Sequence, residues 1–410
     1  MTAVAAPVPL RQDALLIGLI GVAHMMSHYS QLMLAPLFPF IKEAFSVSYA
    51  ELGFLMTIFF TVSCLVQAVS GFWVDRRGAR PVLIFGVTLL ALSAFGFAWS
   101  PSYAWMMLFA VVAGTGNGVF HPVDYTLINQ QVSAGRLGHA YSAHGITGTL
   151  GWAIAPVMLV PLAVTYSWRV ALLGAGALIT AVLVLVWFNR HLIHDKKPGN
   201  SAAPTRTNAG AQSSSFEFLR IPAVWMCFAF FFIFAMSLSV IQAFAPGAAR
   251  ELHQVPLTLV AVCLTTYMLA SASGMVLGGF LATNPERASR VVGAGFAVAT
   301  LVSLCLGLAE LSAWMVPVFF GVMGFVAGTA GPSRDLLVKR STPDNASGRV
   351  FGVVYSGLDI GQAVSPLFFG WLMDQHHYQG VFVGLAAIQG VLVLTAFRVR
   401  HARRTVLKGA

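Results

Sequence analysis

The fold of this chain is decided by the stretch Gly71-Phe72-Trp73-Val74-Asp75-Arg76-Arg77-Gly78-Ala79-Arg80-Pro81-Val82-Leu83. Its charged centre joins two long apolar runs, near residues 48–74 and 81–100. About twenty apolar residues in a row can cross a hydrocarbon core of about 30 Å as a helix. The stretch is therefore typical of a short basic loop between two membrane-spanning helices.

The composition extends this interpretation to the whole chain. Of its 410 residues, 57% are hydrophobic and only 9% are charged, whereas a soluble domain carries about 25% charged residues. The apolar runs are long and do not alternate with polar residues, which excludes a β-barrel. The sequence predicts an all-α membrane protein with twelve spanning helices, near residues 14–40, 48–74, 81–100, 103–131, 138–162, 169–189, 220–246, 256–282, 289–309, 312–337, 350–373 and 379–397.

The net charge of +10 follows the membrane topology and does not indicate a nucleic-acid partner. Nearly all basic residues fall in alternate loops and at both ends of the chain, and only Lys42, Arg169 and Arg250 fall on the opposite side. Because basic loops stay in the cytoplasm, we expect a multi-pass protein of the bacterial inner membrane with both termini cytoplasmic.

The chain divides into two similar halves. A polar stretch at 190–219 predicts a cytoplasmic linker between a six-helix bundle at 1–189 and a second at 220–410. Four segments recur in the same order at nearly constant separation: Gly71-Phe72-Trp73-Val74 with Gly279-Phe280-Leu281-Ala282, Pro122 with Pro332, Tyr141-Ser142 with Tyr355-Ser356, and Pro156 with Pro366. We therefore expect two pseudo-symmetric bundles with a substrate route between them.

The stretch from Gly71 to Leu83 resembles the loop signature of the major facilitator superfamily, Gly-x-Leu-Ala-Asp-Arg-x-Gly-Arg-x-x-x-Leu. The resemblance implies that Gly71, Asp75, Arg76 and Arg80 form a charged latch on the cytoplasmic side; the simpler alternative is a basic loop that only sets topology. In the second half, Thr283 stands where the signature has its acid. Shorter stretches resemble two different branches: Phe120-His121-Pro122 the fosmidomycin-resistance proteins, and Pro332-Ser333-Arg334-Asp335 the carriers of organic acids.

Ionisable residues inside spans are functional candidates, because a charge in lipid costs several kcal/mol. His24 and His28 are four apart on the first span and so share one helix face. They would line a cavity, serve as packing residues, or bind a metal as a His-x-x-x-His pair. We favour the cavity and expect no metal site and no cofactor.

The fourth span supplies the first candidate for a proton site. It carries Asn117, His121 and Asp124, and we expect Pro122 to break the helix between His121 and Asp124. An Asp beside a His can hold and tune a proton. The alternative is a purely structural pair.

The tenth span carries the one cation we place within a span, Arg334, next to Asp335. A guanidinium forms two parallel hydrogen bonds to a carboxylate or phosphonate. Arg334 would thus contact substrate, pair with Asp124 as a gate, or sit in a permanent ion pair; Asp335 is assigned to gating. The remaining candidates for proton coupling are His144 and Asp359. Substrate binding is assigned to His24, His28, Asn117, Gln242, Tyr267, Arg334, Tyr355 and Gln362.

The chain has no phosphate-binding loop or catalytic triad motif, so we predict a transporter and not an enzyme. The leading hypothesis is a monomeric, proton-coupled carrier of a small organic anion such as a carboxylate, working by alternating access. The main alternative is a proton-coupled multidrug or antibiotic efflux antiporter. A membrane sensor without transport activity is a third.

Overall fold

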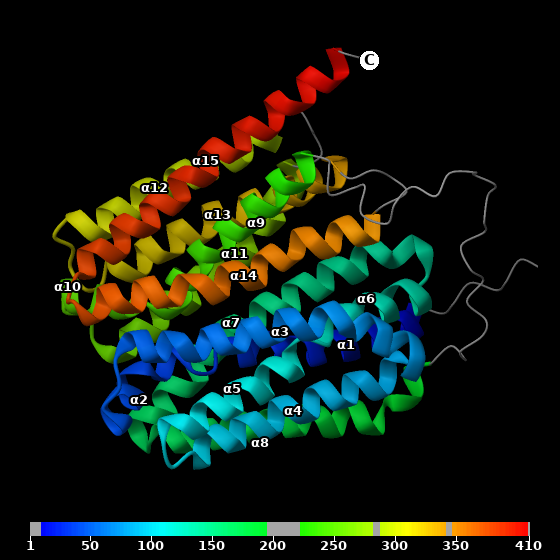
Figure 1. Cartoon of the computed structure of the whole chain (residues 1–410), viewed down its shortest axis with the longest axis horizontal. Helices are drawn as coiled ribbons and strands as arrows, with labels where there is room; N and C mark the ends of the chain where they lie inside the picture. The colour runs from blue at the N-terminus through cyan, green and yellow to red at the C-terminus, as the bar shows by residue number, and fades with distance from the viewer. Residues whose placement is uncertain (1–9, 195–221, 282–287, 342–346, 409–410) are drawn as a thin grey trace, which may run out of the picture. The chain divides into compact units, whose positions relative to one another are not determined.

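The computed structural model describes residues 10–194, 222–281, 288–341 and 347–408, with the side chains of 134, 223, 288, 334–355 and residues from 396 onward left out. Within these ranges every regular element is helical (Figure 1). Among the described residues, ten helical stretches are long and apolar enough to cross a membrane. The long helices α1 and α14 bring the number of crossings to the predicted twelve when α5 and α6 count as one crossing.

The chain forms two compact units, each with many contacts within itself. Their bounds differ from the two halves of the sequence. Unit 1 comprises Met1–Leu34 and Val62–Ala209, and unit 2 comprises Ala35–Thr61 and Gly210–Ala410. The division thus falls inside the helix α3 (Tyr49–Arg77), whose first part packs with unit 2. The predicted linker lies mostly outside the described residues.

Unit 1 is built from long helices in chain order: α1 (Leu10–Gln31), the second part of α3, α4 (Ala79–Trp99), α5 (Tyr103–Asn117), α6 (Phe120–Gln131), α7 (Leu137–Thr165) and α8 (Trp168–Phe188). Short 3-10 turns η2 (Ala134–Arg136) and η3 (Arg190–Leu192) follow α6 and α8. Within the unit, α1 packs on α7, and α4 packs on α5 and α8 (Figure 1).

Unit 2 repeats this plan: η1 (Ala35–Leu37), α2 (Phe38–Phe45), the first part of α3, α9 (Pro222–Ala243), α10 (Ala245–His253), α11 (Leu257–Leu281), α12 (Ala288–Leu308), α13 (Val316–Ser341), α14 (Ser347–Asp374) and α15 (Tyr378–Lys408). Here α9 packs on α14, and α12 packs on α13 and α15. These are the counterparts of the three contacts in unit 1, so the duplicated plan read from the sequence is present in the packing.

Two short helices strengthen the repeat. After α1, the chain forms α2, and after α9 it forms α10; each has a proline in its first turn. Both end on a residue with positive φ, Ser46 at 54° and Gln254 at 52°. The first span is consequently shorter than predicted: it ends at Gln31, and residues to 40 belong to η1 and α2. Prolines at 36 and 39 explain why α1 does not continue.

The fourth crossing also differs from the prediction. The break lies at Gly118 and Val119, between α5 and α6, and not between His121 and Asp124, which share α6. Pro122 falls in the first turn of α6, where the missing N–H leaves no hydrogen bond unmade. The break lies at a closely packed glycine: a Cβ at Gly118 would lie 2.5 Å from the backbone oxygen of Ser63.

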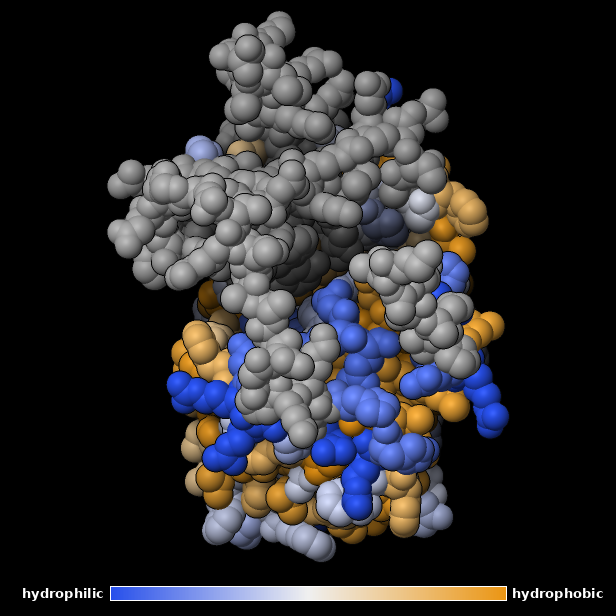
Figure 2. Space-filling view, turned by 90° about the vertical axis from the view of Figure 1, so that its right-hand side faces the viewer, coloured by the Kyte–Doolittle hydropathy of each residue, from blue (hydrophilic) through white to orange (hydrophobic). Residues whose placement is uncertain are grey.

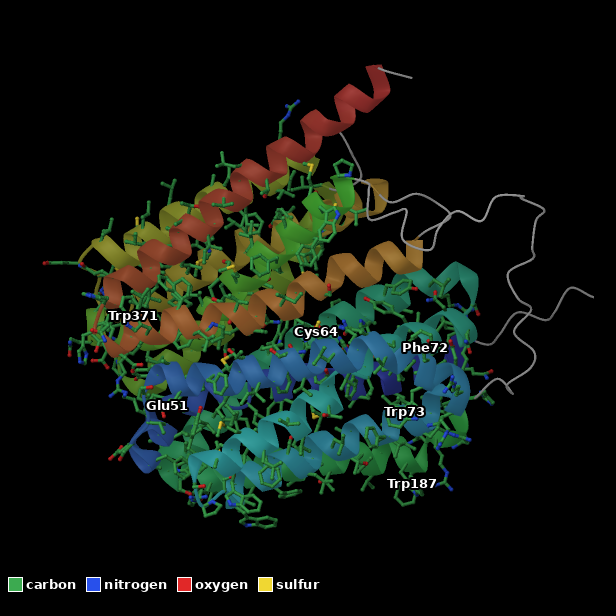
Figure 3. The ribbon with its side chains drawn as sticks, in the orientation of Figure 1. Glu51, Cys64, Phe72, Trp73, Trp187 and Trp371 are labelled. Atoms are coloured by element: carbon green, nitrogen blue, oxygen red, sulfur yellow. The ribbon has the colours of Figure 1, made fainter. Side chains whose placement is uncertain are left out.

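Aromatic side chains mark the ends of the helices, as membrane interfaces favour. Figure 3 shows α3 running from Glu51 at one end, past Cys64, to Phe72 and Trp73 at the other. Trp187 lies at the same end of unit 1 as Phe72, and both are exposed. Figure 2 shows the end of the molecule at which hydrophilic side chains gather, with hydrophobic ones along its margins.

Candidate functional site

Four histidines and one aspartate come together inside unit 1. His24 and His28 lie on α1, His121 and Asp124 on α6, and His144 on α7. The His24 ring centroid lies 4.5 Å from that of His28, 5.6 Å from His121 and 3.6 Å from His144. Segments far apart in the chain thus build one cluster, which we call the histidine cluster.

Asp124 is the acidic centre of the histidine cluster. Its Oδ2 lies 3.1 Å from His144 Nε2, with hydrogen-bond geometry, and 3.0 Å from His24 Nδ1 at ion-pair distance only. Asp124 is 0% exposed, and both imidazoles are buried. The second oxygen, Oδ1, is buried and has no hydrogen-bond partner among the described residues. One oxygen is therefore shared by two rings while the other is left unsatisfied.

The predicted pairing within the fourth span is only part of this arrangement. His121 lies on the same helix as Asp124, yet its Nδ1 lies 3.0 Å from Gln67 Oε1 on α3. The close partners of Asp124 come instead from α1 and α7. Spacing along one helix does not reveal such contacts between helices, and Gln67 was missed although it is a polar residue inside an apolar run.

Glycines let α7 approach the rings. A Cβ at Gly148 would lie 2.9 Å from His28 Nδ1 and 3.1 Å from His24 Nε2, and one at Gly151 would meet the backbone oxygen of Met25. Glycine at both positions allows close helix approach. The Gly-rich stretch of the fifth span thus has a direct steric reason: it makes room for His24 and His28.

A second polar group surrounds Asn117. Its Oδ1 accepts hydrogen bonds from Ser27 Oγ at 2.6 Å and Gln31 Nε2 at 3.2 Å, and its Nδ2 donates to Ser63 Oγ at 2.8 Å. Ser63 directly precedes Cys64, which marks its level on α3 in Figure 3. Asn117 therefore ties α1, α3 and α5 together, a role beyond the substrate contact that the sequence suggested.

Trp152 links this group to the histidine cluster. Its Nε1 donates to Gln31 Oε1 at 3.1 Å, and its ring lies 4.2 Å from that of His28. Trp152 could not be singled out from the sequence, since aromatic residues are frequent in this chain. His28, His121, Gln67 and Trp152 are all partly exposed. Polar side chains in the middle of spanning helices face water and not lipid.

Ring nitrogens in this region converge. One ligand atom each of His24, His28 and His121 lie within 4.8 Å of one another, and the same holds for His24, Asp124 and His144. Such spacing is compatible with a metal ion, the alternative that the sequence raised for His24 and His28. It is equally the spacing of donors that converge on an oxyanion.

The remaining candidates lie outside the histidine cluster. In unit 2, Gln242, Tyr267 and Gln362 are buried, and Asp359 is half-buried. Gln242 Nε2 and Gln362 Oε1 have no hydrogen-bond partner among the described residues. The side chains of Arg334, Asp335 and Tyr355 are outside the described part of the chain.

The predicted latch residues lie where the sequence placed them. Gly71, Asp75 and Arg76 are at the end of α3, and Arg80 is in the first turn of α4. Asp75 and Arg76 are exposed, and Gly78 between the helices has φ of 89°. That left-handed conformation favours glycine and allows the sharp turn into α4.

Comparison with known proteins extends the same fold to the whole chain. The family model for the Major Facilitator Superfamily matches residues 20–320 and 231–410. The fosmidomycin resistance protein of Escherichia coli is 24% identical over 93% of this chain and 92% of its own. The probable sulfoacetate transporter SauU of Cupriavidus necator is 21% identical over 93% of this chain and 92% of its own.

A solved structure agrees in fold. The bacterial homolog of the human lysosomal transporter Spinster, in an inward-facing and occupied conformation, matches with a TM-score of 0.79 at 16% identity, covering 98% of this chain and 99% of that one. The chain belongs to the Major Facilitator Superfamily, and like the members of that family it is a multi-pass membrane transporter of small molecules and not an enzyme.

Proposed function

We propose that this protein is a secondary transporter that moves a small organic anion, such as a carboxylate, together with protons by alternating access. The observation that carries the proposal is Asp124: a wholly buried carboxylate with two imidazoles on one oxygen and, among the described residues, no hydrogen-bond partner on the other. We assign the coupled proton to Asp124 together with His121 and His144.

The unsatisfied oxygen of Asp124 is the reason for this assignment. A buried carboxylate oxygen without a donor is costly. Protonating it removes the charge that makes burial unfavourable. When Asp124 is ionised, the two imidazoles at Oδ2 are the groups that offset its buried negative charge. The group thus has two states that differ by one proton, as coupling to a proton gradient requires. Asp359, half-buried in unit 2, is proposed as a second proton-binding residue.

The choice of an anion rests on the balance of charges. Four imidazoles gather around one carboxylate, so the histidine cluster can carry more positive than negative charge. An anionic cargo would supply the missing negative charge beside His28 and His121, the partly exposed histidines of the cluster. Sulfoacetate, which the relative SauU is named for, is an organic anion, which agrees with this choice.

A second candidate is an efflux antiporter for drugs or antibiotics. The relative that confers fosmidomycin resistance aligns along nearly the full chain, and the same proton site would serve export. The two functions differ in the direction of cargo movement relative to protons, which a reconstituted system resolves.

Other assignments complete the proposal. Gly71, Asp75, Arg76 and Arg80 would form the cytoplasmic latch, with Asp335 as a further gating residue. Substrate contacts would come from His24, His28, Asn117, Gln242, Tyr267, Arg334, Tyr355 and Gln362. The protein would act as a monomer in the bacterial inner membrane with both termini in the cytoplasm.

The test uses purified protein in liposomes that enclose a pH-sensitive dye. Small carboxylates, phosphonates and cationic drugs are added one at a time, and internal pH is followed. We expect acidification with at least one anion, lost in Asp124→Asn and kept in Glu43→Gln, a matched change at an exposed acid. Proton movement only with cationic drugs would favour efflux. Proton movement that persists in Asp124→Asn would remove the proton from this site.

A further inference from the structure

The histidine cluster is divided into an inner and an outer pair. His24 and His144 are buried and lie within 3.1 Å of Asp124 Oδ2. His28 and His121 are partly exposed, and no carboxylate among the described residues lies within ion-pair distance of either. The outer pair is therefore the part of the cluster that is accessible and lacks a negative partner.

Gln67 contacts the outer pair at His121 Nδ1. With the Gln67 amide oriented so that Oε1 faces the ring, this oxygen can only accept, and the 3.0 Å contact then places a proton on His121 Nδ1. A neutral imidazole carries one ring proton only. Neutral His121 therefore presents a lone pair at Nε2, which repels an anion. Only imidazolium offers a second N–H there.

The other outer ring is held in place. His28 packs 4.2 Å from the Trp152 ring, and Trp152 is fixed by its hydrogen bond to Gln31. His28 Nδ1 is buried and has no hydrogen-bond partner within the part of the chain that the structure describes. The two outer rings have centroids 6.5 Å apart and are oriented edge to face. They can flank a single carboxylate or phosphonate group.

We propose that Gln67 makes anion binding at the outer pair depend on proton uptake: the cargo's acidic group binds between His28 and His121 only when His121 carries both ring protons. Gln67 is then a positioning residue that couples one proton to one anion. This inference rests on the proposed function and adds to it the location of the acidic group and the origin of the coupling.

Other groups that face His121 come from three helices. His24 and His28 approach from α1, His144 lies 6.3 Å away on α7, and Tyr125 lies 6.1 Å away on α6, with Asp124 on the same helix. Each can move the pH at which His121 takes up its second proton. None of them fixes the tautomer, because the contact to Nδ1 comes from Gln67.

The first test reads the tautomer directly and needs no cargo. Protein labelled with 15N-histidine is studied in nanodiscs by NMR, with His121→Asn used to assign the His121 signals. We expect the neutral Nδ1–H form in the wild type and a loss of that form in Gln67→Leu. Gln130→Leu, at an exposed position near the end of α6, should leave the signals unchanged. A neutral Nε2–H form in the wild type would overturn the proposal.

The second test measures binding of acetate, methylphosphonate and sulfoacetate across pH. For any of these that binds, the wild-type affinity should fall about tenfold per pH unit above the His121 transition, since one proton is linked to each anion. In Gln67→Leu the neutral ring can place its proton on Nε2, so this slope should nearly disappear. Gln130→Leu should keep it. An unchanged slope in Gln67→Leu contradicts the inference.

The outcomes separate this inference from the proposed function. Proton-coupled transport that depends on Asp124 but shows no effect of Gln67→Leu would refute the role of Gln67 and leave the proposed function standing. A bound metal, found by elemental analysis of the purified protein and lost in His28→Ala, would refute the anion site itself. Absence of any anion-driven proton movement in the liposome panel would refute the proposed function.

Discussion

Gly148 leaves no room for an added methyl group beside the histidine cluster. A Cβ there would lie 2.8 Å from His28 Cε1 and 2.9 Å from His28 Nδ1. Real Cβ atoms do not approach so closely, so the ring must move. The ring is packed against Trp152, which limits where it can go.

Gly148→Ala should therefore lower the rate of transport about tenfold or more, since overpacking of this kind costs about 1–3 kcal/mol. Uptake by reconstituted protein is the measurement. Gly145→Ala is the matched control, because a Cβ at Gly145 meets nothing within 4 Å and the residue is about one turn earlier on α7. Equal losses in the two variants would mean that the helix, and not the histidine cluster, is what fails.

At the same scale, the sequence identified most members of the cluster but not their partners. His24, His28, His121, Asp124 and His144 are all ionisable residues inside apolar runs, which is a visible signal. Their pairing depends on how α1, α3, α6 and α7 pack, and this has no local signature. Gln67 and Trp152 carry no charge, so nothing in the sequence separated them from packing residues.

Among the elements, α3 begins on a carboxylate from α14. Asp374 accepts hydrogen bonds from the backbone N–H groups of Tyr49 at 2.7 Å and Ala50 at 2.8 Å, and Lys42 Nζ lies 3.7 Å away. These N–H groups have no partner within the helix, and the positive end of the helix dipole favours an anion. Farther along, Thr57 Oγ1 donates to Ala363 O at 2.6 Å.

Asp374→Asn removes the charge and one of the two acceptors, so it should destabilise unit 2 by about 1 kcal/mol. Thermal unfolding in detergent measures this as a lowered midpoint. Glu43→Gln makes the same chemical change at an exposed site on α2 and should have almost no effect. A wild-type midpoint in Asp374→Asn would show that the cap contributes nothing.

At the start of α1, just before the predicted span, Asp13 fixes the turn that joins α6 to α7. Its Oδ2 accepts from Arg136 Nη1 at 2.6 Å and from the backbone N–H of Ser133 at 3.3 Å. Burial raises the pKa of Asp13, but the hydrogen bonds from Ser133 and Arg136 outweigh it and hold the pKa below its ordinary value.

Because the folded-state pKa is depressed, the ionised Asp13 stabilises the fold at every pH above its unfolded pKa of about 3.9. That contribution is lost as the pH falls through the lower folded value. Asp13→Asn should therefore unfold at a lower temperature than the wild type near neutral pH, and the difference should shrink below about pH 4. A difference that stays constant through the acid range would contradict the role of the charge.

Element boundaries were less predictable than element number. The break between α5 and α6 was expected at Pro122 but lies at Gly118 and Val119. Pro122 falls in the first turn of α6, where a proline does not interrupt the helix. The end of α1 at Gln31 was likewise missed, because the apolar run continues into η1 and α2, although Pro36 and Pro39 disfavour a continuous helix there.

For the whole molecule, the duplicated plan could be predicted because it leaves repeated residues in the sequence. The helix pairs that pack in unit 1 recur in unit 2, and Ser46 and Gln254 end equivalent short helices in the same conformation. The division within α3 could not be predicted. A continuous apolar helix has no feature that shows which neighbours each of its turns contacts.

The latch at the end of α3 is a whole-molecule prediction, because its effect would be on the exchange between conformations. Asp75→Asn should reduce the transport rate severalfold while leaving the amount of inserted protein unchanged. Uptake normalised to membrane-inserted protein is the measurement, and Glu43→Gln, an exposed acid outside the signature, is the control. Wild-type kinetics in Asp75→Asn would refute the latch.

The central claim is that Asp124 carries the proton that drives transport. Two modes of transport in liposomes separate carrying the anion from coupling it: uptake driven by an imposed pH gradient, and exchange of labelled for unlabelled anion without a gradient. Asp124→Asn should keep the exchange and lose the gradient-driven accumulation. Accumulation that still follows the pH gradient in Asp124→Asn would contradict the account, because the proton would then be carried elsewhere.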